Sequence, residues 1–364
     1  MGAILHAICL ISAPAAERWK LQYFYDQDQS ELELRDLACP SADHCVAVGV
    51  IDHDGREKGA AVITSDSGEH WSLIELKERP GCIFFLNDTL GWMATNAGIW
   101  RTEDTGRTWT KLQKLEAIQS LYFLDDSHGF AAGSKAAAYV TVDGGKTWKK
   151  VAEADQPDAV REQTVYDWVV FDGPLHGFIL GYSAPRQKSR TPDWIDPERA
   201  RFRSGDPITE ITLETQDGGK TWNHSKREST GDLARLKVTS RGMALGLVIY
   251  PNFSKYPAEL ERVDLGSFET QTLYREADRV VTDFAQLPNG EVFLAAVEAP
   301  GKLKDVPIPG KLKVSSSADL ATWSDMEVDY RAEAQRAVFA GPDRAHLWVA
   351  TDTGMILKLD TSRR

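Results

Sequence analysis

Short apolar runs separated by turn residues recur along the whole chain. Cys82-Ile-Phe-Phe-Leu86 is followed by an Asn-Asp-Thr-Leu-Gly turn and a second run, Trp92-Met-Ala-Thr95. The same order of strand, turn and strand begins again at Ser120 and at Asp167. Runs of this length, bounded by Gly, Asn and Asp, are typical of β-strands joined by hairpins. The hydrophobic pattern therefore predicts an all-β chain.

A polar motif, Ser/Thr-x-Asp-x-Gly-x-x-Trp, alternates with these runs. Four segments match it, and we call them the Asp boxes; their Asp and Trp residues are Asp66 and Trp71, Asp104 and Trp109, Asp143 and Trp148, and Asp217 and Trp222. In such a hairpin the Gly supplies a positive φ, the carboxylate accepts N–H groups of the turn, and the Trp packs into the sheet. We therefore interpret these Asp residues as structural rather than catalytic. Altered copies surround Asp264 and Asp319.

The repeat has four strands in about 40 residues, which is the period of a propeller blade. Seven such segments begin near Leu34, Cys82, Ile118, Val165, Leu233, Val280 and Ala337. The seventh ends at Asp360 after three strands, and the apolar segment at residues 19–24 has no blade of its own. We expect this N-terminal strand to pair into blade seven, with Asp360 and Trp19 as the two halves of a divided Asp box. The predicted fold is a seven-bladed β-propeller with Asp-box hairpins, blade seven closed by the N-terminal strand, as one domain over residues 17–364.

The first 16 residues differ from the repeat. An apolar stretch at residues 2–11 precedes Ser12-Ala-Pro-Ala-Ala16, a run of small residues. This order predicts a signal peptide and export to a periplasmic or extracellular space. A buried N-terminal strand is the alternative.

The cysteines and the charge narrow the classes further. Cys39 and Cys45 flank a short turn, and we expect them to form a disulfide in an exported protein. Cys82 has no obvious partner and is interpreted as a small buried apolar residue. The metal-binding spacing Cys-x-x-Cys does not occur, so we expect no metal and no cofactor. A formal net charge of -12 disfavours nucleic acid as a partner.

Loops on one face of the predicted propeller interrupt the repeat. The Asp boxes join the third and fourth strands of each blade, so the loops between the second and third strands lie on the opposite face, which we call the long-loop face. These loops are long at residues 183–207, 250–257 and 298–310, and long loops on a rigid scaffold often carry recognition. The candidate binding residues are Arg186, Lys188, Arg190, Trp194, Arg199, Arg201, Arg203, Tyr250, Phe253 and Tyr256. The alternatives are basic side chains that pair with nearby carboxylates and aromatic side chains that anchor the loops.

The innermost strands offer a second candidate site. Aligned on their first apolar residues, they place Asp36, Cys82, Ser120, Asp167, Arg235, Asp283 and Ala337 in one column. The candidate channel residues are therefore Asp36, Asp167, Arg235 and Asp283. We favour hydrogen bonds from these side chains to the backbones of neighbouring blades; a cation or small-molecule site is the alternative.

The motifs carry a family resemblance. The Asp boxes, together with Leu121-Tyr-Phe-Leu-Asp125 and the residues that follow it to Gly133, resemble the photosystem II assembly and stability factors. That family consists of seven-bladed propellers within the sialidase-like Asp-box (BNR) superfamily. The resemblance covers most of the chain and is strongest over residues 34–222. It implies an exported, chaperone-like protein that binds a partner without catalysis. The Arg-Ile-Pro motif of sialidases does not occur in this sequence.

We therefore predict an exported, non-catalytic binding scaffold, of the kind that assists assembly of a membrane or envelope complex. It would act as a monomer on a protein partner or assembly intermediate and would not bind nucleic acid. Peripheral contact with a membrane and binding of a glycan stay open. The alternative function is a glycan-binding or glycoside-hydrolase propeller of the sialidase type that uses Asp36, Asp167, Asp283 and Arg235.

Overall fold

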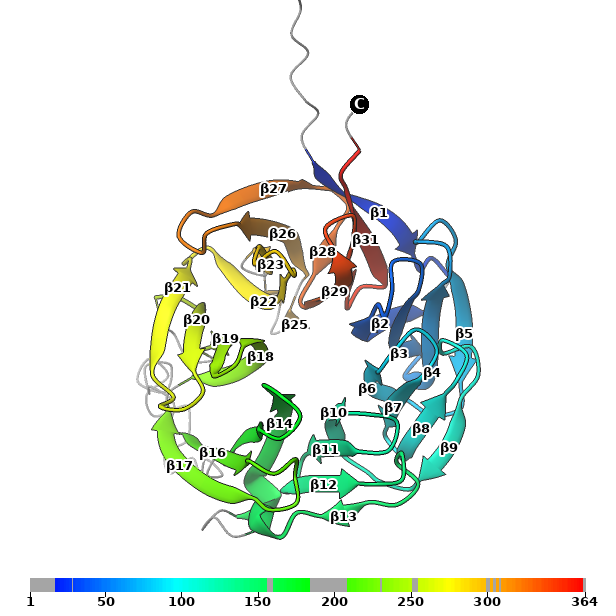
Figure 1. Ribbon diagram of the computed structural model, residues 1–364. Helices are drawn as coiled ribbons and strands as arrows, with labels where there is room; N and C mark the ends of the chain where they lie inside the picture. Colours follow the sequence, from blue (N-terminus) through cyan, green and yellow to red (C-terminus); the bar gives the residue numbers. More distant parts are fainter. Residues whose placement is uncertain are drawn as a thin grey trace, which may run out of the picture.

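The computed structural model describes residues 17–27, 29–155, 160–183, 208–229, 231–250, 255–298, 302–303, 306–307 and 309–362. Their strands form groups of four that stand around a central opening (Figure 1). Within each group consecutive strands pair antiparallel, and the first strand lies nearest the centre. The chain therefore adopts the predicted all-β propeller fold.

We number the groups as blades in chain order. Blade one contains β2 (Glu31–Ala38), β3 (Cys45–His53), β4 (Arg56–Thr64) and β5 (Ser72–Leu76). Blade two contains β6 (Pro80–Phe85), β7 (Gly91–Thr95), β8 (Gly98–Thr102) and β9 (Thr110–Gln113). Blade three contains β10 (Ile118–Phe123), β11 (Gly129–Gly133), β12 (Ala137–Thr141) and β13 (Lys149–Lys150). Blade four contains β14 (Thr164–Phe171), β15 (Gly177–Ser183), β16 (Ile208–Thr215) and β17 (Asn223–Ser229).

The second half of the ring follows the same order with additions in blade six. Blade five contains β18 (Asp232–Ser240), β19 (Met243–Ile249), β20 (Ala258–Asp264) and β21 (Thr270–Arg275). Blade six contains β22 (Arg279–Gln286), β23 (Val292–Glu298), β26 (Gly310–Ser317) and β27 (Ser324–Val328), with the short strands β24 (Lys302–Leu303), β25 (Val306–Pro307) and β28 (Glu333–Ala334) beside them. Blade seven contains β29 (Ala337–Asp343), β30 (His346–Thr351), β31 (Met355–Asp360) and β1 (Arg18–Phe24).

The N-terminal strand closes the ring, as predicted. β1 pairs antiparallel with β31 from Arg18 opposite Asp360 to Phe24 opposite Met355. β1 also pairs in parallel with β27 of blade six at Arg18 and Trp19. Because of this second pairing, blades six and seven belong to one nine-stranded sheet, whereas the other five blades are separate four-stranded sheets. Because two groups share one sheet, the number of sheets does not give the number of blades, and the number seven stays a prediction.

The divided Asp box at the termini differs from the complete ones. In the complete boxes the carboxylate accepts an N–H from the residue before the Trp. The Asp360 carboxylate instead accepts the N–H of Ser362 at 3.0 Å and forms an ion pair with Lys20. Trp19 is nevertheless fully buried, in contact with the rings of Phe293 and Phe339.

The Asp boxes hold their hairpins in the same way in blades one to four. In blade two, Thr102 Oγ1 donates to Asp104 at 2.8 Å and accepts the N–H of Gly106 at 2.9 Å. The Asp104 carboxylate also accepts the N–H and the hydroxyl of Thr108. These bonds favour the ionised carboxylate and lower the pKa of Asp104, although its partial burial acts in the opposite direction. The box Asp residues are thus structural groups.

Each box aromatic lies in the seam between its own blade and the preceding one. Seven clusters of buried apolar side chains occupy the seams between neighbouring blades, and each contains or contacts one such aromatic: Trp71, Trp109, Trp148, Trp222, Phe268, Trp323 and Trp19. The turn glycines let the hairpins come close to the preceding blade. A Cβ at Gly219 would lie 2.3 Å from Cε1 of Phe130 in blade three.

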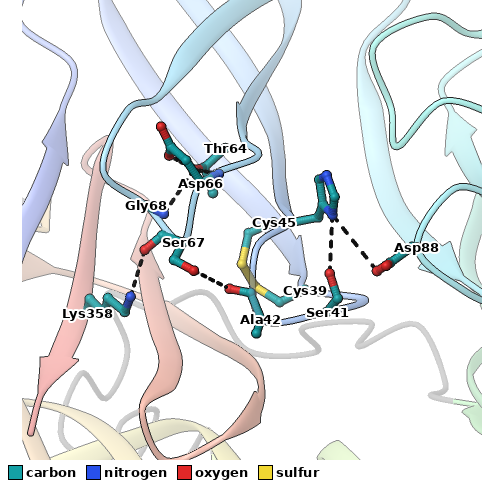
Figure 2. The surroundings of a disulfide bond; sticks show 11 residues. Cys39, Ser41, Ala42, Cys45, Thr64, Asp66, Ser67, Gly68, Asp88 and Lys358 are labelled. Atoms are coloured by element: carbon teal, nitrogen blue, oxygen red, sulfur yellow. Dashed lines mark hydrogen bonds and ion pairs between the residues drawn. A yellow bond between two sulfur atoms is a disulfide. The ribbon is translucent and has the colours of Figure 1, made fainter.

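Cys39 and Cys45 form a disulfide in the loop between β2 and β3, with an S–S distance of 2.07 Å (Figure 2). The loop contacts the Asp box of its own blade, where Ser67 Oγ donates to the carbonyl of Ala42 at 3.0 Å. Lys358 of blade seven donates to the carbonyl of Ser67 at 2.6 Å. The disulfide loop therefore lies where blade one meets the last blade.

The helices of the described residues are two short 3₁₀ helices, η1 (Ala152–Asp155) and η2 (Arg161–Gln163). Within the described part of the chain no helix has the length and apolarity needed to cross a bilayer.

Candidate functional site

The innermost strand of each group of four borders a central cavity of ≈ 1170 Å³. Its wall includes all four channel candidates, Asp36, Asp167, Arg235 and Asp283. Cys82 and Ser120 line it as well, whereas Ala337 does not belong to the lining. The cavity is therefore the place where the sequence-predicted channel residues come together.

The predicted column is displaced at one functional position. The innermost strands of blades one to six each carry a register shift, for example between Leu34 and Asp36. In blade four the shift lies between Tyr166 and Trp168, so Trp168, not Asp167, is the counterpart of Asp36. Asp167 is the extra residue of the bulge. The prediction that placed Asp167 in the column is wrong by one residue, because Tyr166, and not the first apolar residue Val165, is the counterpart of Leu34.

The last member of the column is also displaced. Val338 pairs with Ala350 of β30 without an intervening bulge, and it is Val338 that lines the cavity. Ala337 lies one residue earlier in the strand. Its backbone bonds with the Thr282 hydroxyl of blade six, at 3.1 and 3.3 Å, instead.

Polar side chains of the column bond to the backbone of the next blade. Asp36 Oδ2 accepts the N–H of Ile83 at 2.9 Å, and its Oδ1 accepts the N–H of Leu37 at 2.9 Å. Asp283 Oδ2 accepts the N–H of Phe339 at 2.7 Å. These are the hydrogen bonds that the sequence analysis favoured. They use the carboxylates to join neighbouring blades.

Serine and tryptophan take the same place in blades three and four. Ser120 Oγ accepts the N–H of Val169 at 3.2 Å, and Trp168 Nε1 donates to the carbonyl of Leu233 at 2.9 Å. Cys82 at the equivalent place in blade two is a free, buried thiol. Burial raises the pKa of Cys82, so the group behaves as the apolar residue that was predicted.

Arginines alternate with these carboxylates along one side of the cavity. Arg235 Nε lies 3.0 Å from Asp283 Oδ1, and Arg336 donates to the carbonyl of Arg35 at 2.7 Å. Burial raises the pKa of Asp36 and of Asp283, and the charges of Arg235 and Arg336 partly oppose that effect. The wall from blade five round to blade one is thus charged, and its arginines partly balance the negative charge of its carboxylates.

The opposite side of the cavity is aromatic. Phe84, Tyr122 and Trp168 line it from blades two, three and four. The rings of Phe84 and Tyr122 are 5.4 Å apart, and Arg235 lies 5.3 Å from the Trp168 ring. Burial raises the pKa of Tyr122, so its hydroxyl stays protonated. A bound chain would meet rings on one side and charges on the other.

Asp167 stands apart from the other channel carboxylates. Burial, and then the nearby charge of Asp232, raise its pKa to about 6. Burial and the charge of Glu210 raise the pKa of Asp232 in turn. Among the residues that the structure describes, none donates a hydrogen bond to the Asp167 side chain or forms an ion pair with it, so this carboxyl is available to a ligand.

A narrow pocket leaves the cavity at this point and runs between blades four and five. It has a volume of ≈ 50 Å³, and Asp167, Trp168 and Tyr182 line both spaces. Its outer end reaches Arg227 of β17 and Phe268 of the altered box in blade five. The sequence pattern gave no sign of this pocket beyond the Phe that replaces a box Trp.

The long-loop candidates are only partly described. Arg186, Lys188, Arg190, Trp194, Arg199, Arg201, Arg203 and Phe253 lie outside the described residues. Tyr250 and Tyr256 are described, and both serve as anchors. The Tyr250 hydroxyl is 3.4 Å from Glu259 Oε2, and the Tyr256 ring lies 4.5 Å from the Arg275 guanidinium. Both tyrosines therefore hold the base of the blade-five loop.

Sequence reasoning missed several groups that line the cavity. Arg336 precedes the innermost strand of blade seven, and Lys237 lies two residues after Arg235. Lys237 donates to the carbonyl of Gln286 at 3.0 Å, and burial lowers its pKa. The alternation of side chains along β18 would have placed Lys237 on the same face as Arg235. For Arg336 the sequence carries no comparable signal.

The arrangement defines a β-propeller with a charged and aromatic central cavity. Among the described residues no group of three His, Cys, Asp or Glu side chains could hold a metal ion. The fold is similar to that of YCF48. A structure of YCF48 from Cyanidioschyzon merolae is 18% identical, with a TM-score of 0.59 over 95% of this chain and 98% of that chain.

Other solved structures support the same fold. YCF48 bound to a D1 peptide is 18% identical, with a TM-score of 0.57 over 93% of this chain and 99% of that chain. The WD40 β-propeller domain of Doa1 is 11% identical, with a TM-score of 0.55 over 94% of this chain and 97% of that chain. No protein-family model and no curated protein matches the sequence. At these identities the likeness establishes the propeller fold.

Proposed function

We propose that the chain is a non-catalytic scaffold that binds a segment of a protein partner in its central cavity, from the long-loop face. The observation that carries this proposal is that two of the cavity carboxylates, Asp36 and Asp283, are already bonded to other groups of the protein. Both oxygens of Asp36 accept backbone N–H groups, and those of Asp283 face Phe339 and Arg235. These groups hold the blades together, so they are poor candidates for acid–base chemistry.

The cavity is large enough for an extended peptide and offers groups for its recognition. Its ≈ 1170 Å³ exceeds the volume of a typical small-molecule site, which is about 300–1,000 Å³. Arg336 can bind a carboxylate or a carbonyl, Asp167 a cation, and Tyr122 an apolar side chain. The YCF48 propeller that was solved with a D1 peptide supports a peptide-like partner. We propose assistance to assembly as the biological setting.

We also propose that the protein works in an oxidising compartment after export. The Cys39–Cys45 disulfide supports this setting, since such bonds persist mainly outside the cytosol.

Site-specific photo-cross-linking tests the proposed binding mode. A benzophenone amino acid at Gln119, whose exposed side chain lines the cavity, should cross-link a partner in the producing cells. The same group at Glu228, on the outer strand of blade four, serves as the control. Arg336→Glu should reduce the yield from Gln119, whereas Lys149→Glu on the outer strand of blade three should not. Equal yields from Gln119 and Glu228, or no effect of Arg336→Glu, would overturn the proposal.

Glycan binding remains the second candidate, because three aromatic side chains line the cavity beside the free carboxyl of Asp167. Hydrolysis by the usual mechanism needs two available carboxyl groups. With Asp36 and Asp283 engaged, such a pair would have to combine Asp167 with Asp232, which also lines the cavity. A glycan array on the wild-type protein and on Trp168→Ala tests this candidate; an array with no bound glycan removes it.

A further inference from the structure

The pocket between blades four and five has a cause in the sequence. The other complete or nearly complete boxes place a Trp in their seam, whereas blade five places Phe268 there. The Phe268 ring meets Phe178 edge-on at a centroid distance of 5.9 Å. The smaller ring leaves part of the seam unfilled, and the pocket of ≈ 50 Å³ results.

The shape of the pocket selects a thin group. Its walls are largely apolar, with Leu180, Leu236 and Val263 among them. A cavity that holds benzene measures about 150 Å³. At a third of that volume, this pocket accepts an unbranched alkyl chain better than a ring.

The outer end of the pocket already contains a cation of the protein itself. Arg227 forms an ion pair with Glu210 and donates to the carbonyl of Phe268 at 2.9 Å. This guanidinium joins blade four to blade five and balances the carboxylate beside it. An entering group would therefore come from the inner end, where the pocket joins the central cavity.

The inner end is lined by carboxyl groups. Asp167 lies there; burial, and then the charge of Asp232, raise its pKa, and burial and the charge of Glu210 raise the pKa of Asp232. Within the described residues, neither Asp167 nor Asp232 forms an ion pair with a Lys or Arg side chain. Tyr182, whose pKa both carboxylates raise, lines the same place. Charge complementarity therefore calls for a cation at the end of an apolar chain.

We propose that this pocket binds a small unbranched primary alkylammonium ion, with the alkyl chain inside the pocket and the ammonium group at its inner end. The methylene groups would contact the apolar wall, and the ammonium group would pair with Asp167. The pocket itself can be tested without any partner.

The test uses n-butylammonium chloride as the probe and the complete chain labelled at its indole nitrogens. The Trp168 indole donates to the carbonyl of Leu233 at the pocket wall, so its NMR signal should shift saturably with the probe. Sodium butyrate and n-butanol, which lack the cation, should produce no saturable shift. Asp167→Asn should weaken binding about tenfold, since hydrogen bonds to charged groups are the stronger ones. Phe268→Trp should abolish binding by filling the pocket.

The matched control is Glu228→Gln, which removes a carboxylate from the exposed strand β17 of the same blade and should leave binding unchanged. Equal binding to wild type and Asp167→Asn, or equal shifts with n-butanol, would overturn the proposal that the pocket binds an alkylammonium ion. That result would leave the cross-links from Gln119 unaffected. Conversely, butylammonium binding without those cross-links would uphold the pocket and overturn the proposed partner site.

Discussion

Two seams of this propeller occupy equivalent positions in the repeat but differ in chemistry. Between blades two and three, Trp92 stacks on Phe123 at 3.6 Å and donates to the carbonyl of Gly144 at 2.9 Å. Between blades four and five, Phe178 and Phe268 meet edge-on, and four acidic side chains lie nearby: Asp167, Asp232, Glu210 and Glu261. The first seam is filled by rings, and the second contains a pocket.

The difference shows what the repeat provides and what it leaves open. Each blade needs an aromatic side chain in its seam, and a large ring fills that space completely. Where blade five uses a smaller ring, packing is lost and a space appears whose lining includes Asp167, Glu210 and Glu261. Function can develop there because the remaining seams hold the ring together.

The largest expected difference comes from truncating one ring in each seam. Trp92→Ala should lower the free energy of unfolding by about 4–5 kcal/mol, because it removes a fully buried ring and a hydrogen bond. Phe178→Ala, the counterpart in blade four, should cost about 3 kcal/mol. Urea titration followed by tryptophan fluorescence and circular dichroism measures both. Equal costs would mean that the two seams do not differ in packing.

The disulfide should have the next largest effect, at the seam where the chain closes. Replacing Cys39 and Cys45 together with Ser should lower stability by about 2 kcal/mol, as expected for a short closed loop. A reducing agent should give the same loss in the wild-type protein. Tyr330→Ala, whose side chain is 82% exposed, should change stability by less than about 0.5 kcal/mol and is the control. A double Ser variant as stable as wild type would contradict the loop's role.

The box carboxylates can be compared with the seam carboxylates through single variants. Asp104→Ala should lower stability by about 1–2 kcal/mol, as for other side chains that cap backbone N–H groups. Glu103→Ala, next to it on the exposed side of the hairpin, should have little effect. Thermal unfolding of both variants at neutral pH provides the measurement. A larger loss in Glu103→Ala would argue against the hydrogen bonds of the box.

Asp167→Asn should raise the stability of the protein, whereas Asp104→Ala should lower it. The pKa of Asp167 is about 6 in the folded protein, above its value of about 4 in an unfolded chain. The folded state therefore holds this proton between about pH 4 and pH 6, and its stability falls as pH rises through that window. Asp167→Asn should stabilise by about 1–2 kcal/mol above pH 6.5 and by little near pH 4. A gain that does not depend on pH would contradict this origin.

The box carboxylates determine how the stability of the protein changes at acidic pH. Hydrogen bonds to the Thr147 hydroxyl and N–H lower the pKa of Asp143 to about 2, and similar bonds lower that of Asp217 to about 2. Their contribution is complete above about pH 4 and is lost as pH falls towards 2. Acid unfolding of Asp143→Asn should therefore resemble that of wild type more closely at pH 2.5 than at pH 6. Parallel curves at both pH values would contradict this assignment.

The sequence predicted the features that follow from repetition. The Asp boxes, the short disulfide loop and the pairing of the N-terminal strand with blade seven all depend on local patterns or on a missing fourth strand. The site was harder to predict, because the strand of blade four begins one apolar residue earlier than its counterparts, so that Trp168 and not Asp167 stands in the column. The pocket depends on the difference in volume between Phe268 and a Trp, which only the packing of two blades reveals. Arg336 enters the cavity from a turn with no motif.

The pairing of β1 with β31 has a consequence for the newly made chain. β1 is synthesised long before β31, the strand at Met355–Asp360 with which it pairs. Until then Trp19 has no cover from β31, and the edges of the first and last blades stay open to other strands. Pairing across such a sequence separation forms slowly. A chaperone that shields the N-terminal strand during synthesis would therefore raise the yield of closed rings, and a nascent chain stalled before Met355 would be a preferred substrate for quality-control proteases.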